Sequence, residues 1–556
     1  MSEPLANPSG GLKDTYATVV IGSGYGGAIT AARLAERGLP VCLLERGREW
    51  HPGDFPDTLR GLAGSVRSKK RPLGYVDYYF CQALDVLKAS GLGGTSLMNA
   101  NVALRPDVEL FAEKSWPKLY RDLAAAGAIW KYYQKAEEML RVGPHPKARE
   151  LTKVQMIEKR ADEVTDKKFW AMPIAVNFDV DGPNHVGVPQ KPCINCNDCI
   201  TGCNVGAKNT LYMNYIPYAR QKGAEIFTQI EVLWIEKRDG GYAVHYRYNQ
   251  ADGFGEPREL RARHVVLSGG ALGSTEILLR SVQHGLTVSS HLGDGFSGNG
   301  DYLALAYNSD YRTNVLGYGN HPDSPPRSDV KPGPNIVSAI QYHRGQPVKE
   351  RFTIQDFSTF PSGLVDFFRY TLPGLAAVTG TDMDSGFKDK LRELGRVKDD
   401  LVGWNPDGAA NHSMVYLGMA IDNAQGKMAL DDKDRLTIQW PSLATDPIYK
   451  KVDDELREHA RTLGATYVHL GRFNPWTHSN NLVTAHPMGG CHLGEDADSG
   501  VVDVDGRVFD GQGGVHQGLY VVDGAIIPMA LAVNPLITIS ALAERIAERM
   551  VPVVAG

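Results

Sequence analysis

The sequence of 556 residues lacks the features that mark membrane-spanning, secreted or nucleic-acid-binding proteins. No apolar run reaches the roughly 18 residues that a membrane-spanning helix needs. A formal net charge of −5 leaves no basic excess, so neither nucleic acid nor bulk attraction to anionic membranes is expected. Residues 1–14 lack a basic stretch followed by an apolar one. We therefore expect no secretory signal and a cytoplasmic location.

Cysteine is also scarce, and its copies are unevenly placed. Seven cysteines in a chain of this length do not indicate a disulfide framework. Four of them, Cys193, Cys196, Cys199 and Cys203, have the spacing C-x2-C-x2-C-x3-C. Bacterial ferredoxins space their iron–sulfur ligands in this way, with proline where this chain has Asn204. The alternatives are a zinc site, whose cysteine pairs usually stand further apart, a disulfide, or a loop without metal.

The first strong motif follows an apolar run at residues 18–21, which predicts a buried strand. Gly22-x-Gly24-x-x-Gly27 ends that strand, and a helical pattern comes next. This order of strand, glycine turn and helix is the context that a dinucleotide fingerprint needs. Gly22 permits the tight turn, Gly24 lets the backbone approach a pyrophosphate, and Gly27 lets helix and strand pack closely.

A second predicted strand at residues 40–44 ends in Glu45. A carboxylate at this place accepts hydrogen bonds from an adenosine ribose and would repel a 2′-phosphate. The ligand is therefore expected to be FAD or NAD, and not NADP.

Three further regions bear on the architecture. Residues 91–101 are rich in glycine and small hydroxyls, so their backbone can pass close to a flat cofactor. Short strands at 242–248 and 260–266 predict an antiparallel piece, and a second strand–glycine–helix pattern predicts that the parallel sheet resumes near residue 267. Residues 300–480 contain no fingerprint and are expected to bind substrate. Their apolar stretch 357–378 is either a buried helix or a pocket wall.

Four blocks of the chain together resemble the glucose–methanol–choline (GMC) oxidoreductases. They are the Gly22 fingerprint with Glu45, the Gly91–Asn101 loop, the Ser268–Ser281 block, and a C-terminal region with His486, Asp523 and Asn534. Three C-terminal segments are most similar in sequence to the cholesterol-oxidase branch: His486-Pro-Met-Gly-Gly-Cys491, Tyr520-Val-Val-Asp-Gly524 and Val533-Asn-Pro-Leu-Ile-Thr538.

The resemblance implies an α/β fold, α+β overall. A discontinuous Rossmann-like FAD-binding domain is joined to a substrate-binding domain with an antiparallel sheet and covering helices. We expect a flexible lead at 1–14. The FAD-binding domain is expected at 15–115, 204–305 and 481–556. The substrate-binding domain, including the cysteine loop, is expected at 116–203 and 306–480.

The resemblance also implies the site residues. His486 and Asn534 are expected at the reactive edge of the flavin. There His486 accepts or orients the hydroxyl proton and Asn534 holds the alcohol oxygen. Asp356 stands where the branch has a further base, a glutamate, and has a shorter side chain. The residues expected to bind FAD are Gly22, Gly24, Gly26, Gly27, Glu45, Arg46, Gly91, Gly93, Gly94, Thr95, Ser96, Asn99, Ala100, Asn101, Val232, Asp523, Gly524, Asn534 and Pro535.

The implied reaction is oxidation of a bulky apolar alcohol, with a sterol as the first choice. Electrons pass to O2 or to an external acceptor. One alternative is a dehydrogenase in which Cys193, Cys196, Cys199 and Cys203 hold an iron–sulfur cluster that serves a protein or quinone acceptor. Others are a lyase that retains FAD, since fold does not settle chemistry, and a flavin-binding protein without turnover. Contact with a membrane is expected to be peripheral at most.

Overall fold

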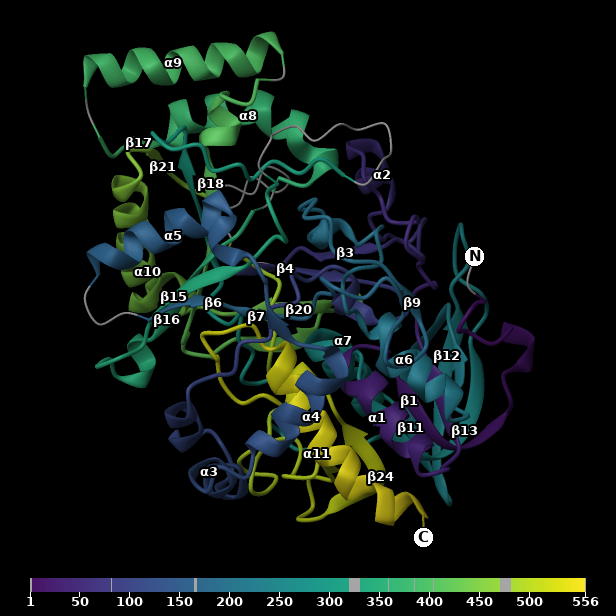
Figure 1. Ribbon diagram of the computed structural model, residues 1–556. Coiled ribbons are helices and arrows are strands. Elements are labelled where there is room, and N and C mark those ends of the chain that lie inside the picture. Colours follow the sequence, from purple (N-terminus) through teal and green to yellow (C-terminus); the bar gives the residue numbers. More distant parts are fainter. Residues whose placement is uncertain are drawn as a thin grey trace.

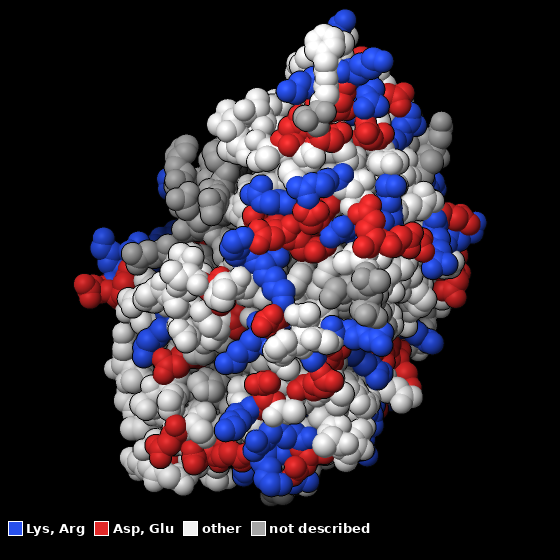
Figure 2. Space-filling model, turned by 90° about the vertical axis from the view of Figure 1, so that its left-hand side faces the viewer, with Lys and Arg blue, Asp and Glu red and all other residues white. Residues whose placement is uncertain are grey.

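The computed structural model describes residues 3–81, 83–164, 168–319, 331–358, 360–384, 386–403, 405–470 and 482–555. Two large sheets organise this part of the chain, one of eight strands and one of seven (Figure 1). The molecule is therefore mixed α/β, as the sequence predicts. On the face in Figure 2, Lys and Arg are interspersed with Asp and Glu over most of the surface. None of the described helices is long and apolar enough to cross a membrane.

The eight-stranded sheet has the order β10-β2-β1-β13-β12-β11, with β24 beside β13 and β23 beside β24. The carboxyl half of β13 pairs in parallel with β1 and β24, and its amino half pairs antiparallel with β12. The predicted antiparallel piece and the return to parallel pairing at Leu267 are both confirmed. The strands are β1 Thr15–Ile21, β2 Val41–Leu44, β10 Glu225–Phe227, β11 Ile230–Arg238, β12 Gly241–Tyr248, β13 Arg258–Leu267, β23 Arg507–Phe509 and β24 Val515–Val521.

The parallel core of this sheet is covered by helices. Val19, Leu43 and Val266 are fully buried, as expected where both faces of a parallel sheet are covered. Helix α1 packs against α11, which in turn packs against α4. The helices of this part are α1 Tyr25–Glu36, α2 Leu59–Gly64, α3 Lys118–Ala125, α4 Trp130–Leu140, α6 Tyr215–Gln221, α7 Gly270–Gln283 and α11 Leu536–Ala555.

The seven-stranded sheet has the order β17-β21-β14-β18-β16-β15-β6, and its pairings are antiparallel. Helices α5 and α10 cover one face, and α8 packs against β21 on the other. The elements are β6 Lys168–Ala171, β14 Tyr302–Tyr307, β15 Ser338–Tyr342, β16 Phe352–Asp356, β17 Thr381–Asp382, β18 Met414–Ala420, β21 Thr466–His469, α5 Thr152–Glu163, α8 Val365–Thr379, α9 Phe387–Val402 and α10 Pro447–Thr462.

Several small sheets accompany the two large ones. Strand β22 pairs in parallel with β4, so the segment with His486 and the glycine-rich loop follow the same end of this small sheet. The short strands are β3 Val76–Tyr79, β4 Leu84–Ala89, β5 Gly143–Pro144, β7 Pro173–Ile174, β8 Gly182–Pro183, β9 Pro189–Gln190, β19 Lys427–Leu430, β20 Leu436–Gln439 and β22 Leu482–Thr484.

Three segments differ from the sequence expectations. The apolar stretch 357–378 is not a buried helix, because in α8 only Val365, Arg369 and Leu372 are buried. Helix α4, expected with the substrate domain, packs on α11, where its Tyr133 donates a hydrogen bond to Thr538. The expected flexible lead is hydrogen-bonded to the body, since residues 5 and 6 donate to the Glu49 carboxylate.

Candidate active site

The glycine turn after β1 is shaped by close backbone contacts on one side and open space on the other. Gly22 has φ of +97°, and a Cβ there would lie 2.3 Å from the carbonyl oxygen of Ser268. A Cβ on Gly26 or Gly27 would lie 1.6 or 1.9 Å from a backbone oxygen. At Gly24 nothing lies within 4 Å of an added Cβ. The turn is therefore packed behind and open at Gly24, as close approach of a pyrophosphate requires.

Glu45 ties this turn to the strand beside it. The buried carboxylate accepts hydrogen bonds from Ser23 Oγ at 2.6 Å and from the backbone N–H of Gly47 at 2.8 Å. Ser23 Oγ in turn accepts from the backbone N–H of Gly93 at 2.9 Å. A carboxylate has about four acceptor sites, so Glu45 retains capacity for a ribose hydroxyl.

The Gly91–Asn101 loop faces the open side of the turn. A Cβ on Gly94 would lie 3.0 Å from Gly24 Cα, so the two glycine segments are in near contact. Asn99 donates to Tyr25 Oη at 3.0 Å, and Asn101 donates to the carbonyl oxygen of Ala175 at 2.8 Å. The Oδ1 atoms of both asparagines are buried without a hydrogen-bond partner in the described structure. Such orphaned acceptors are costly, and they suit the N–H groups of a flat heterocycle.

Asp523 completes the edge formed by the carboxyl ends of the parallel strands. It follows β24, and its carboxylate accepts from the backbone N–H groups of Gly270 and Ala525, both at 2.8 Å, and from Ser274 Oγ. Burial raises the pKa of Asp523 to about 6. The carbonyl oxygen of Gly524 accepts from the backbone N–H of Gly489, which brings the His486 loop to the same edge.

Two of the residues expected to bind the cofactor, Arg46 and Val232, lie after β2 and in β11 of the eight-stranded sheet. Val232 stands two residues beyond Ile230, whose backbone N–H donates to the carbonyl oxygen of Glu45 at 2.9 Å. The guanidinium of Arg46 forms a buried ion pair with Asp77. Contact of Val232 and Arg46 with a cofactor stays a prediction.

The residues present fit FAD at this edge. The open face at Gly24, the facing loop and the two orphaned asparagine oxygens together offer space, backbone and acceptors. The remaining expected residues, Thr95, Ser96, Ala100 and Pro535, belong to the same loop or to the start of α11.

His486 and Asn534 are brought together from two distant segments. His486 follows β22 and Asn534 precedes α11, and Asn534 Nδ2 lies 3.3 Å from His486 Nε2. On the other side of the ring, Nδ1 lies 2.8 Å from Oδ1 of the buried Asp301. Asp301 also accepts from Thr484 Oγ1 at 2.8 Å and from the backbone N–H of Ala485 at 2.9 Å. These donors hold the carboxylate where it orients the imidazole.

Gln355, and not Asp356, reaches this pair. Gln355 Nε2 donates to Asn534 Oδ1 at 2.7 Å, which orients the amide so that Nδ2 points at His486. Gln355 Oε1 is buried without a hydrogen-bond partner in the described structure. Asp301 lies in no motif, and Gln355 was passed over because the family resemblance of its segment pointed to the next residue, Asp356.

The expectation that Asp356 serves as a second base is corrected by strand geometry. Successive side chains of β16 point to opposite faces, so Asp356 lies on the face away from Asn534. Its Oδ1 accepts from the backbone N–H groups of Val337 and Ser338, and its Oδ2 lies 3.3 Å from Lys153 Nζ. Burial raises the pKa of Asp356, and Lys153 opposes that shift. Asp356 is therefore a structural ion-pair partner in this fold.

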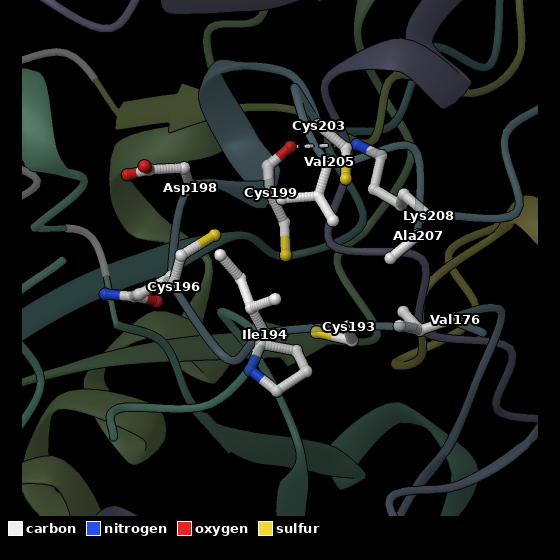
Figure 3. A pocket seen from close by; sticks show the side chains of 12 residues that line it. Val176, Cys193, Ile194, Cys196, Asp198, Cys199, Cys203, Val205, Ala207 and Lys208 are labelled. Carbon is white, nitrogen blue, oxygen red and sulfur yellow. Dashed lines mark hydrogen bonds between the residues drawn. The ribbon is translucent and has the colours of Figure 1, made fainter. Parts of the chain in front are cut away.

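The four clustered cysteines surround one pocket. Cys193, Cys196, Cys199 and Cys203 line it, and their sulfur atoms turn toward a common space in Figure 3. All four are free thiols in the structure, so the disulfide alternative is not observed.

The spacing of the sulfurs bears on which metal group fits the pocket. In the described structure no three of them lie within 4.8 Å of one another. Sulfurs bound to a single zinc ion would be at most about 4.6 Å apart, so the set is too wide for one zinc without rearrangement.

A buried lysine joins the cysteine loop to the glycine-rich loop. Lys208 Nζ donates to the carbonyl oxygens of Leu97, Asn99 and Cys199 at 2.8 to 2.9 Å. Its side chain lines the cysteine pocket (Figure 3), and burial lowers its pKa to about 8. The contacts of Lys208 were not foreseen, because a lone lysine between two loops carries no pattern.

Comparison with known proteins agrees with this geometry. A sequence profile described as GMC oxidoreductase matches residues 61–297, and a second of the same description matches residues 422–543. A cholesterol oxidase of Acinetobacter baumannii is 27% identical, covering 95% of this chain and 93% of the relative. A long-chain-alcohol oxidase of Arabidopsis thaliana is 23% identical, covering 96% and 67%.

Solved structures share the fold. Pyridoxine 4-oxidase from Mesorbium loti superposes with a TM-score of 0.57 at 16% identity, covering 96% of this chain and 98% of that one. A fungal aryl-alcohol oxidase gives a TM-score of 0.54 at 14% identity, covering 97% and 99%. The two profiles together span more than half of the sequence. The chain therefore belongs to the GMC oxidoreductases, a family of FAD-binding enzymes that act on CH–OH donors.

Proposed function

We propose that this protein oxidises the hydroxyl group of a bulky apolar alcohol, sterol-like in the first instance, to the carbonyl. The observation that carries the proposal is the continuous contact of Asp301, His486, Asn534 and Gln355. It presents one basic nitrogen and one amide at the edge where the cofactor residues converge.

The hydrogen bonds define what each side chain can do. Asp301 accepts a hydrogen bond from Nδ1–H of His486, which leaves the lone pair on Nε2. The alcohol hydroxyl donates to that nitrogen and transfers its proton there as the carbonyl forms. Gln355 holds the Asn534 oxygen, so Asn534 Nδ2 stays beside His486 Nε2. An alcohol oxygen bound between the two would replace this contact, donating its hydroxyl to Nε2 and accepting a hydrogen from Nδ2. FAD, when bound, supplies the acceptor for the hydride that leaves the carbinol carbon.

The substrate class rests on similarity. The relatives described above are a cholesterol oxidase and a long-chain-alcohol oxidase, and both names denote large apolar alcohols as substrates. Identities of 27% and 23% do not carry a particular alcohol to this chain. We therefore assign the class and leave the choice within it to experiment.

The test is anaerobic reduction of the bound flavin by cholesterol in detergent micelles and by a long-chain primary alcohol. His486→Ala should retain its flavin and be reduced about 10²- to 10³-fold more slowly. His492→Ala, on the same loop, is the matched control and should keep the wild-type rate. Full-rate reduction of His486→Ala would overturn the assignment. Product formed without flavin bleaching would indicate a lyase.

A second candidate concerns the electron acceptor, and the cysteine pocket favours it. We propose that Cys193, Cys196, Cys199 and Cys203 hold an iron–sulfur cluster, which when bound would supply a path for electrons from the flavin to an external acceptor. Four free thiols turned toward one space, too wide for a single zinc ion, suit a larger inorganic group. The buried Lys208 adds a positive charge beside thiolates that would carry negative charge.

The pocket also lies within reach of the catalytic groups. Gln355 Nε2 lies 3.5 Å from Met172 Sδ, and Val176, four residues further along, lines the cysteine pocket. Four residues of extended chain span at most about 14 Å.

This candidate is tested by assaying iron and acid-labile sulfide in anaerobically purified protein. Wild type should contain both, whereas Cys199→Ser and Cys203→Ser should lose them and keep the flavin. Cys81→Ser, outside the pocket, is the control. Flavin without iron or sulfide in wild type would overturn the cluster and leave the alcohol oxidation intact, with O2 as the acceptor.

A further inference from the structure

Helix α9 has its apolar side turned away from the protein. At 3.6 residues per turn, the five most exposed of its large apolar side chains fall within one arc of about 100°, and Val397, just outside that arc, packs against the core. A surface helix normally buries such an arc against the core. Here the arc is exposed, with fractional exposures of 79% for Phe387, 54% for Leu391, 65% for Leu394, 53% for Leu401 and 81% for Val402.

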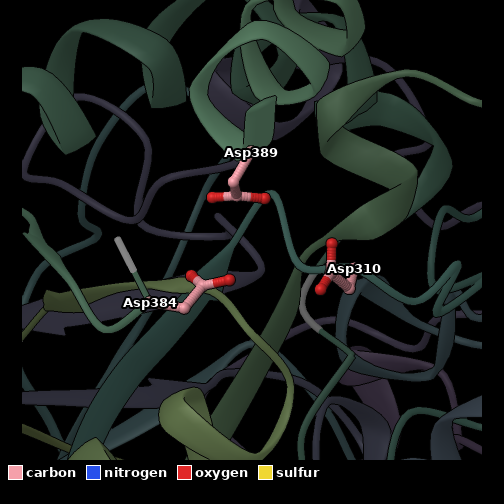
Figure 4. A group of neighbouring side chains, drawn as sticks. All are labelled: Asp310, Asp384 and Asp389. Carbon is pink, nitrogen blue, oxygen red and sulfur yellow. The ribbon is translucent and has the colours of Figure 1, made fainter. Parts of the chain in front are cut away.

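The opposite side of α9 is held to the body by polar contacts. Asp389 and Asp400 are buried, and Asp400 accepts from the backbone N–H of Ala410 at 2.7 Å. Arg396 donates to the carbonyl oxygens of Asn308 and Ser309. Figure 4 shows Asp389 on this inner side, facing two further carboxylates from neighbouring loops. The orientation of the helix is therefore set by its polar face, and the apolar arc is left without cover in the described structure.

The charges of α9 are divided in the same way. All of its exposed charged residues are cationic: Lys388, Lys390, Arg392 and Lys398. Of these, Arg392 also forms ion pairs with Asp310 and Asp389. Its four acidic residues are buried or half-buried. The helix forms the upper tip of the molecule in Figure 1, and the tip in Figure 2 ends in Lys or Arg and uncharged side chains, with red side chains beneath.

We infer that α9 is a docking surface for an anionic lipid membrane. An amphipathic helix with an apolar side and flanking Lys or Arg lies in the membrane interface, apolar residues among the acyl chains and cations at the headgroups. The neighbouring α8 also exposes apolar side chains, since Tyr370 and Val378 are 57% and 85% exposed. Exposed apolar surface of this kind marks an interaction site.

The charge pattern distinguishes the membrane from a second copy of this chain. A two-fold contact places each patch against its own copy, so Lys388, Lys390, Arg392 and Lys398 would face the same cations. The net charge of −5 does not oppose the proposal, because at physiological salt charges beyond about 8 Å are screened. Only the tip approaches the lipid.

The inference goes beyond the proposed reaction and is tested without turnover. Purified holoenzyme is floated with vesicles of phosphatidylcholine alone or mixed with phosphatidylserine. Wild type should float with the mixed vesicles, more weakly with phosphatidylcholine, and less in high salt. Lys398→Glu should weaken binding to the mixed vesicles about fivefold or more. The double variant Leu394→Asp/Val402→Asp should weaken it about tenfold or more.

Two measurements separate membrane docking from loss of folding or from self-association. Val553→Asp removes an apolar residue that is 50% exposed on α11 and should leave vesicle binding unchanged. In Phe387→Trp, the indole emission should shift to the blue when mixed vesicles are added. Failure of wild type to float with the mixed vesicles overturns the inference. An equal loss of vesicle binding in Val553→Asp also overturns it. So does self-association that Leu394→Asp abolishes, if wild type does not bind vesicles.

Discussion

Asp301 Oδ1 lies 2.8 Å from Nδ1 of His486, although the two residues come from different segments of the chain. This contact places a buried carboxylate behind the imidazole and leaves Nε2 as the ring nitrogen on the side of Asn534. In the proposed reaction His486 would therefore act as the base without a second base from β16.

Asp301→Asn should slow flavin reduction strongly while leaving the flavin bound. An asparagine amide can donate to Nδ1, which would move the imidazole proton to Nε2 and remove the acceptor that the alcohol needs. A loss of about 10²- to 10⁴-fold in the rate of anaerobic reduction is expected, as for other carboxylates that hold a catalytic histidine. Asp505→Asn, near the far end of α11, is the control. A rate within a few-fold of wild type for Asp301→Asn would contradict this role.

Gln355→Leu and Asp356→Asn should separate catalysis from stability at adjacent positions. Gln355 orients Asn534, so its replacement should lower the rate of flavin reduction with little change in melting temperature. Asp356→Asn should leave the buried Lys153 ammonium without its anionic partner and cost about 3 kcal/mol of folding stability, although the hydrogen bonds of that ammonium to Asn335 and Ser358 remain. The pair is compared by stopped-flow reduction and thermal unfolding. Slow reduction in a stable Asp356→Asn would return that residue to the reaction.

Glu393, on the inner side of α9, should make the protein less stable as pH rises. Burial, followed by the charges of neighbouring aspartates such as Asp389, raises the pKa of Glu393 to about 7 from an ordinary value of 4.5. In the window between these values the folded state binds more protons than the unfolded state, so stability falls as pH rises. Because the side chain is half-exposed, the effect should be under about 1 kcal/mol.

Glu393→Gln should therefore match wild type near pH 4 and melt at a higher temperature than wild type near pH 8. The comparison is made by thermal unfolding at both pH values. Glu458→Gln, on the exposed side of α10, is the control and should show no such crossover. A variant less stable than wild type at pH 8 would show that the ionised Glu393 stabilises the fold.

The sequence was informative where chemistry depends on a local pattern. The order of strand, glycine turn and helix located the parallel edge. Gly27 is required by its contact with Gly22 inside the turn, whereas Gly22 and Gly26 are required by the backbone that follows the neighbouring strands β13 and β24. His486 and Asn534 were identified because their segments are similar to those of the family. The contact between their side chains confirms only that they are neighbours. The partners of this pair were not predictable, since Asp301 and Gln355 reach it through long-range packing.

The sequence did not predict the direction in which side chains point. Periodicity identified an apolar stretch near residues 357–378 but could not tell whether it faced the core, a pocket or solvent. At the end of β16 a shift of one residue changes the face of the sheet, so a motif-based choice of Asp356 fell on the wrong side. In α9 the polar face is the one held to the body, which reverses the usual interpretation of an amphipathic helix.

Lys208→Met should loosen the flavin and the cysteine loop together. The ammonium donates to three carbonyl oxygens, two in the Gly91–Asn101 loop and one at Cys199, and methionine offers no donor to replace it. Leaving these buried acceptors unpaired should cost about 1–3 kcal/mol of stability. The variant should also lose flavin faster during gel filtration than wild type or the exposed control Lys222→Met. Unchanged flavin retention with a lowered melting temperature would confine Lys208 to the cysteine loop, and an unchanged melting temperature would mean that water replaces its hydrogen bonds.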